Sequence, residues 1–239
     1  WITGDAGRDI LLGGNGDEVG KALAPAPNGG LYVGATTTSN NNGDVGPSKG
    51  SKDFWVLHLD RNLSIVWQKA FGGSNIEELN TLTTGPNNTI IAAGSTKSNN
   101  NGDVGALKGG EDMWIVQLNA TTGALGWQKI YGGMNIEVAK GIISKANGDI
   151  VVAGYTYSNN SLDVPANHGA GEFWILGLNN TGGLVWSKTM GGDNEDLAHA
   201  IAESADGFIV SGSTLTHNSG DVGASKGNSD MWVVKFKDN

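Results

Sequence analysis

The sequence predicts an all-β protein made of four repeated antiparallel sheets, and three observations lead to this prediction. Gly-Gly pairs recur about every 60 residues, at positions 13, 72, 132 and 191, and each begins the same order of acidic, apolar and Asn/Gly-rich segments. Gly accounts for 39 of the 239 residues, and charged residues for only 16%. Short apolar stretches alternate with turn residues along the whole chain. A fixed period of this size indicates one supersecondary unit that is used repeatedly.

The second unit shows the elements of one repeat. After Gly72-Gly73, short β-forming stretches alternate with turn residues such as Gly85-Pro86-Asn87-Asn88 and with an Asn/Gly-rich loop over 98–110. Connections of hairpin length predict a single antiparallel meander of four strands. The four strands are predicted over residues 77–84, 89–96, 112–119 and 125–131.

The other units align with the second one position by position. Their third strands repeat an order of aromatic or Met, Trp and aliphatic residues, which is typical of strands that are buried on both faces. One alternate row of the first strands consists mostly of Gly and Ala, so this row is expected to face a common axis. The units are predicted over residues 13–71, 72–131, 132–190 and 191–239.

The two ends of the chain indicate how the units are arranged. The last unit ends after its third strand, and residues 5–12 stand where a fourth strand ends in the other units. We therefore expect the 5–12 segment to complete the last sheet, which would close a ring and remove the open edge. The predicted fold is a four-bladed β-propeller with four antiparallel strands in each blade, and it forms a single domain over residues 1–239.

The order of motifs also resembles a known family. In the third unit, Gly-Gly is followed by Asn135-Ile136-Glu137, the turn 146–149, the strand 150–156 and the strand 173–178. This order is similar to the secreted bacterial β-propeller repeats and the related delta-60 repeats, and the resemblance covers nearly the whole chain. It implies a propeller fold and an extracellular or cell-surface location within a large protein. It implies no particular activity.

Composition narrows the classes of partner. The formal net charge of -9 and the pI near 4.8 argue against a nucleic-acid partner, which selects a basic face. No apolar stretch approaches the roughly 20 residues of a membrane span. The absence of Cys excludes disulfides and thiolate metal sites. Because the chain begins at Trp1 rather than Met, we expect it to be part of a longer protein or assembly.

The loop between the second and third strands carries a regular set of oxygen donors. In each unit an Asn precedes an Asp by three residues, and a second carboxylate follows nine residues later. Ca²⁺ takes ligands of this kind, whereas the same residue types also close turns on their own backbone, and both interpretations stay open. The candidate Ca²⁺ sets are Asn41, Asp44 and Asp53; Asn100, Asp103 and Asp112; Asn160, Asp163 and Glu172; and Asn218, Asp221 and Asp230.

Two further charged sets recur in the repeat. Cationic residues in the loop either form ion pairs within a blade or bind an anionic or sugar ligand. Acidic residues at the start of the first strands either form a ring in an axial channel that binds a cation, or cap the turn between blades by accepting backbone N–H bonds. The cationic set is Lys49, Lys108, His168 and Lys226, and the axial acidic set is Glu18, Glu77, Glu137 and Asp196.

Trp residues recur on the third and fourth strands. Packing between blades is the expected role of the third-strand set, because it recurs in step with the core. Trp67, Trp127 and Trp186 of the fourth strands lie nearer the outer edge. If a Trp of this set is exposed, it can stack on a sugar ring.

The chain contains no His-Glu-x-x-His, no phosphate-binding loop and no Cys nucleophile. Gly-x-Ser-x-Gly occurs at 46–50 and 223–227, but both matches lie in the Asn/Gly-rich loops and not at a strand-to-helix nucleophile elbow. We therefore expect a non-catalytic extracellular or cell-surface module that binds a protein or glycan partner. The alternatives are a structural module of a surface or filament assembly and a carbohydrate-active enzyme that uses the loop or axial carboxylates. Departures from the repeat, such as Arg8, Leu162, His199 and His217, are where a specific function is expected.

Overall fold

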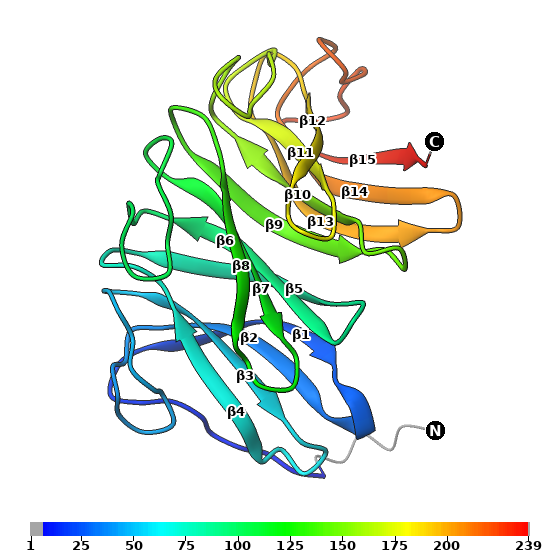
Figure 1. Cartoon of the computed structure of the whole chain (residues 1–239). Coiled ribbons are helices and arrows are strands. Elements are labelled where there is room, and N and C mark those ends of the chain that lie inside the picture. The colour runs from blue at the N-terminus through cyan, green and yellow to red at the C-terminus, as the bar shows by residue number, and fades with distance from the viewer. Residues whose placement is uncertain (1–6, 239) are drawn as a thin grey trace.

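The computed structural model describes residues 7–238, which form four antiparallel sheets in the order of the chain (Figure 1). The first sheet contains β1 (Glu18–Pro25), β2 (Leu31–Thr37), β3 (Asp53–Leu59) and β4 (Ile65–Phe71). The second contains β5 (Glu77–Gly85), β6 (Thr89–Thr96), β7 (Asp112–Asn119) and β8 (Leu125–Tyr131). The third contains β9 (Glu137–Ser144), β10 (Ile150–Thr156), β11 (Glu172–Leu178) and β12 (Leu184–Met190). The last contains β13 (Asp196–Ser204), β14 (Gly207–Thr214) and β15 (Asp230–Lys237).

Each sheet is the antiparallel meander that the repeat predicts. The four strands of the second unit begin at the predicted residues, and only the first extends one residue further. Turn residues with positive φ separate the strands, as at Asn87 (φ 56°) and Asn88 (φ 59°). A single short 3-10 turn, η1 (Pro27–Gly29), connects β1 and β2. The all-β prediction and the four repeated units are therefore confirmed.

The sheets fan out along an arc, with their first strands side by side (Figure 1). β1 contacts β5, β5 contacts β9, and β9 contacts β13. β1 and β13 lie at the two ends of this arc, so the residues from 7 to 238 do not close into a ring.

The predicted closing strand over residues 5–12 is wrong in the part that the structure describes. Residues 7–12 form no strand. The Arg8 Nη1 atom donates to Asn62 Oδ1 at 2.7 Å, and Leu12 packs against the cluster that contains Trp55 and Leu57. The segment thus covers the first sheet, whose apolar face has no preceding sheet against it. Residues 5 and 6 lie outside the described part of the chain.

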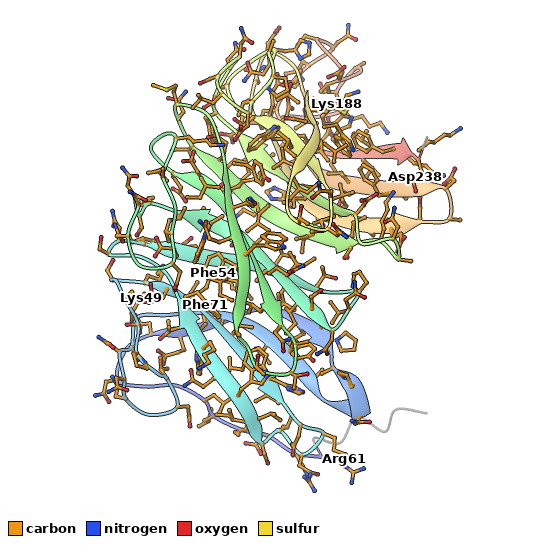
Figure 2. All side chains as sticks on the ribbon, in the orientation of Figure 1. Lys49, Phe54, Arg61, Phe71, Lys188 and Asp238 are labelled. Atoms are coloured by element: carbon orange, nitrogen blue, oxygen red, sulfur yellow. The ribbon has the colours of Figure 1, made fainter. Side chains whose placement is uncertain are left out.

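Hydrophobic clusters fill the spaces between successive sheets. Phe54 and Phe71 of the first sheet (Figure 2) pack in one cluster with Trp114 of the second, and the Phe54 and Trp114 rings are 4.7 Å apart. Phe173 and Trp232 repeat this contact at 4.7 Å between the third and last sheets. Since a buried aromatic or aliphatic side chain contributes roughly 1.5–3 kcal/mol, the third strands hold neighbouring sheets together.

Candidate functional site

The Gly-Gly turns join the sheets, and the axial acidic residues fold back onto them. Glu77 Oε2 accepts the Gly73 backbone N–H at 2.7 Å, and Glu77 Oε1 accepts the Thr96 hydroxyl at 2.7 Å. Each of the other members accepts the matching N–H: Glu18 from Gly14 at 2.9 Å, Glu137 from Gly133 at 2.7 Å and Asp196 from Gly192 at 2.8 Å. Of the two roles left open for this set, the contacts are those of four separate turn caps. The carboxylates of Glu77, Glu137 and Asp196 are fully buried because the turn needs their oxygens as acceptors.

The loop and strand carboxylates of one candidate Ca²⁺ set face different junctions. Asp44 Oδ2 accepts the Gly13 N–H at 3.1 Å, on the side of the first Gly-Gly turn. Asp53 instead accepts the Lys49 N–H at 2.6 Å, and its other oxygen lies against Gly72 at the next turn. The grouping expected from sequence is therefore wrong for Asp44 and Asp53, because the loop carries its two acids to opposite ends of the unit.

The Asn residues of these sets shape the loop. Asn41 adopts a left-handed φ of 51° and donates its backbone N–H to Gly46 at 3.0 Å. Asn100, Asn160 and Asn218 occupy the same backbone region, with φ of 52°, 45° and 56°. Within residues 7–238, no group of three or more Asp, Glu or His side chains is arranged to hold a metal ion. Turn closure thus accounts for the backbone conformation of these Asn residues, and Ca²⁺ binding stays a prediction.

Carboxylates from two adjacent sheets meet at the second, third and fourth Gly-Gly turns. A Cβ atom on Gly72 would lie 1.8 Å from Asp53 Oδ1 and 2.6 Å from Glu77 Oε2, so only Gly fits between them. The Oδ1 atoms of Asp53 and Asp112 are buried without a hydrogen-bond partner. Burial raises the pKa of Asp53, and burial together with the charge of Glu137 raises the pKa of Asp112 to about 6. Burial likewise raises the pKa of Glu172.

The backbone N–H groups of the four repeated cationic residues all donate to the strand carboxylate four residues later, but their side chains do not play one common role. Lys49 forms an ion pair with Asp103, and Lys108 with Asp163, so both link adjacent sheets instead of pairing within a blade. His168 Nδ1 lies 3.4 Å from Glu172 Oε1 in its own sheet. Lys226 uses its backbone N–H, which donates to Asp230 Oδ2 at 2.7 Å. The cations are spread over successive junctions and do not gather into one anion site.

A cleft of about 460 Å³ opens between the third and last sheets. Its wall is an aromatic stack: the Trp186 and Phe208 rings lie 6.2 Å apart at 13°, and the Phe208 and Phe236 rings lie 4.7 Å apart at 10°. Lys188 and Asp238, labelled in Figure 2, also line the cleft. We name this the Trp186 cleft, and it combines an apolar platform with charged groups.

The Trp186 cleft departs from the repeat. Trp67 donates its indole N–H to the Ala120 carbonyl at 3.0 Å and is covered by Gly123, in the turn before β8. Trp127 is covered in the same way by Gly182, in the turn before β12. Trp186 lies against Gly177 and Phe208, but among the described residues no Gly turn of a following fourth strand covers it, and its exposed fraction is 38%. All three fourth-strand Trp residues are at least partly exposed, as expected, and Trp186 is the most exposed of them.

The last sheet also exposes apolar side chains that are buried in the other sheets. Met231 is 80% exposed and Val233 is 51% exposed. The matching residues are Phe54 and Val56, Met113 and Ile115, and Phe173 and Ile175, all at 0%. The physical reason is that each of those pairs lies against a following sheet. We call Met231 and Val233 the apolar patch of the last sheet.

A β-bulge in each first strand is a repeated feature that sequence reasoning missed. The strand register shifts at one residue in all four sheets. At the second sheet this residue is Asn80, whose amide donates to the Ala139 carbonyl of the third sheet at 3.0 Å. The residue at the bulge differs from sheet to sheet, so no sequence motif marks the position of the bulge. The four bulge residues are Lys21, Asn80, Lys140 and His199.

Comparisons with known proteins assign no family to the chain. No family model and no curated protein matches the sequence. Among solved structures, a mutant of the Synechocystis apocarotenoid oxygenase is 13% identical with a TM-score of 0.48, and the match covers 89% of this chain and 47% of that chain. BamB from Moraxella catarrhalis is 11% identical with a TM-score of 0.36, over 84% of this chain and 58% of that chain. This chain spans about half the length of the oxygenase structures.

No helix in the described part of the chain is long and apolar enough to span a membrane.

Proposed function

We propose that the chain is a non-catalytic β-propeller module of an extracellular or cell-surface protein and that it binds a protein partner through its last sheet. The observation that carries this proposal is the apolar patch, because Met231 and Val233 are exposed at positions that are buried in every other sheet. Contiguous exposed apolar groups mark interaction surfaces. The repeated carboxylates Glu18, Glu77, Glu137 and Asp196 are engaged in turns.

The propeller and its location are parts of the same proposal. Four repeated sheets with adjacent first strands support the description of each sheet as a propeller blade. The similarity of the motif order to secreted bacterial β-propeller repeats supports an extracellular or cell-surface location. The net charge of -9 supports a protein or glycan partner over a nucleic acid.

Binding of the full chain to arrays of purified extracellular proteins tests the protein-partner proposal. We expect saturable binding to a small set of proteins and a loss of at least about tenfold in affinity for Met231→Glu and Val233→Glu. Val19→Glu is the matched control, because Val19 is 49% exposed on β1 at the other end of the arc. Binding that survives both last-sheet substitutions, or no binding to any protein, would contradict the proposal.

A glycan is the second candidate partner, and the Trp186 cleft is the observation that favours it. An exposed Trp on an aromatic stack offers a flat platform for a sugar ring, and Lys188 and Asp238 can bond to its hydroxyls. On a glycan array, Trp186→Ala is expected to abolish retention and Trp186→Phe to keep part of it. Flat results on both arrays would favour a structural role in a surface assembly, and turnover of a retained glycan would favour an enzyme.

A further inference from the structure

The outer edge of β15 has no strand beside it within residues 7–238, unlike the other third strands. β3, β7 and β11 each pair with a fourth strand on this side, whereas β15 pairs only with β14. All side chains of β15 are partly or fully exposed. An unpaired edge presents a row of backbone N–H and C=O groups that can pair with one more strand.

Cavities at both ends of this edge match the path of a fourth strand. The turns before β8 and β12 cover Trp67 and Trp127, so the turn before a fourth strand of the last sheet would lie on Trp186, in the Trp186 cleft. A second cavity of about 340 Å³ lies at the other end of β15. We call it the edge groove, and its lining includes Thr216, Gly223, Lys226, Met231 and Trp232.

The edge groove lies where the other sheets hold a polar side chain of the fourth strand. The third-strand indole N–H donates to this side chain in every complete sheet: Trp55 to Gln68 at 3.0 Å, Trp114 to Gln128 at 3.1 Å and Trp174 to Ser187 at 2.8 Å. Gln68 also accepts the Gly46 N–H at 3.2 Å. In the last sheet, the Trp232 indole has no acceptor among the described residues, and no atom lies within 4 Å of a Cβ on Gly223.

We infer that the last sheet binds a partner strand that carries the fourth-strand motif of this repeat, namely a Gly turn followed by Trp, then Gln or Ser, then Lys. In the register of the second sheet, the partner Trp pairs with Lys235, the Gln or Ser with Val234 and the Lys with Val233. The Trp232 indole N–H then gains its acceptor, and the partner turn covers Trp186. This inference rests on the proposed binding role and names the chemistry of the partner.

A peptide with the sequence of residues 179–190, which contains the turn and β12, tests this inference on the full chain. We expect saturable binding by fluorescence anisotropy, and at least roughly tenfold weaker binding of a scrambled peptide of the same composition. Hydrogen exchange should slow for the backbone amides of residues 230–237 and stay unchanged in β3, β7 and β11. Equal binding of the two peptides, or no slowing in β15, would overturn the inference.

Two matched variants locate the binding site. Gly223→Leu places a side chain in the open edge groove and is expected to weaken peptide binding at least roughly tenfold. Gly20→Leu on β1 also enters open space, and it should leave peptide binding unchanged. Peptide binding that is indifferent to Gly223→Leu would overturn the inference. So would self-association of the free chain that protects residues 230–237 without peptide, since it assigns the edge to a second copy.

The array experiment and the peptide experiment test separate claims, so either claim can be wrong while the other stands. If the arrays identify a partner whose binding depends on Met231 and Val233 while the peptide does not bind, the strand motif is wrong and the binding role stands. If the peptide binds and the arrays stay flat, the edge accepts a strand, and the proposed role in binding a separate extracellular protein is wrong.

Discussion

A carboxylate at a Gly-Gly turn has two opposite effects on stability. It accepts backbone N–H bonds that hold the loop, and it buries a negative charge beside a second carboxylate. Asp112 Oδ2 accepts two backbone N–H bonds, from Lys108 at 2.5 Å and Gly109 at 3.2 Å, which hold the loop in place. Its Oδ1 atom is buried without a partner beside the Glu137 carboxylate. The same residue therefore organises the loop and brings an uncompensated negative charge into the junction.

Acidification is expected to stabilise the protein through Asp112. Its folded pKa of about 6 lies above the usual value of 3.8, so the folded state binds more protons between these values. The contribution of Asp112 to the free energy of unfolding therefore rises as the pH falls from 7 towards 4. Asp112→Asn should keep one acceptor for the loop, raise stability at pH 7 by about 1–2 kcal/mol and flatten this dependence. Urea unfolding at several pH values measures both effects.

Asp193→Asn is the control for Asp112→Asn, because Asp193 is exposed and close to the same kind of turn. It should leave both the stability at pH 7 and its slope with pH unchanged. An equal slope with pH in the parent chain and in Asp112→Asn would contradict the role assigned to this carboxyl group.

At the scale of elements, the loops before β7, β11 and β15 fasten their sheets to the preceding ones. Asp103 donates its backbone N–H to the Gly72 carbonyl at 2.8 Å, accepts the Gly72 N–H at 3.2 Å and pairs with Lys49 of the first sheet. The loop thus joins the second sheet to the first through hydrogen bonds and an ion pair. This role accounts for the recurrence of Asp103, Asp163 and Asp221 in the loops.

Replacing Asp103 distinguishes a role of the loop in joining two sheets from a role in binding Ca²⁺. Asp103→Ala is expected to lower the free energy of unfolding by about 1–2 kcal/mol, equally in Ca²⁺ and in EDTA, because it removes an acceptor and an ion pair. Lys49→Met, which removes only the ion pair, should cost less than about 1 kcal/mol. Melting curves in both buffers provide the measurement. A Ca²⁺-dependent rise in melting temperature that disappears in Asp103→Ala would instead support the candidate metal sets.

The strands were predictable because the repeat gives four independent versions of the same pattern. The positions of polar side chains were less predictable, because the loop from Asp44 to Asp53 crosses from one junction to the next and sequence spacing does not show this. The pairing of Lys49 with Asp103 was missed for the same reason. The Trp186 cleft could be anticipated only in part, since Trp67, Trp127 and Trp186 occupy equivalent positions and differ only in what covers them.

At the scale of the whole molecule, the four sheets form an arc whose two ends differ. Residues 7–12 lie against the first sheet, and Leu12 fills part of its apolar face. The repeat alone predicted that this segment would pair with the last sheet, but Arg8 replaces the Trp that a fourth strand carries. The last sheet keeps an open edge, an exposed apolar patch and two cavities. The asymmetry of the arc therefore places the proposed function at its last sheet.

Amide hydrogen exchange of the free full chain tests the open edge of the last sheet most directly. The account predicts that alternate amides of β15, those that point away from β14, exchange at least roughly 100-fold faster than the matching amides of β3, β7 and β11, because no strand pairs with them. Equal protection of all four third strands would show that the edge of β15 is already paired, and it would contradict the account.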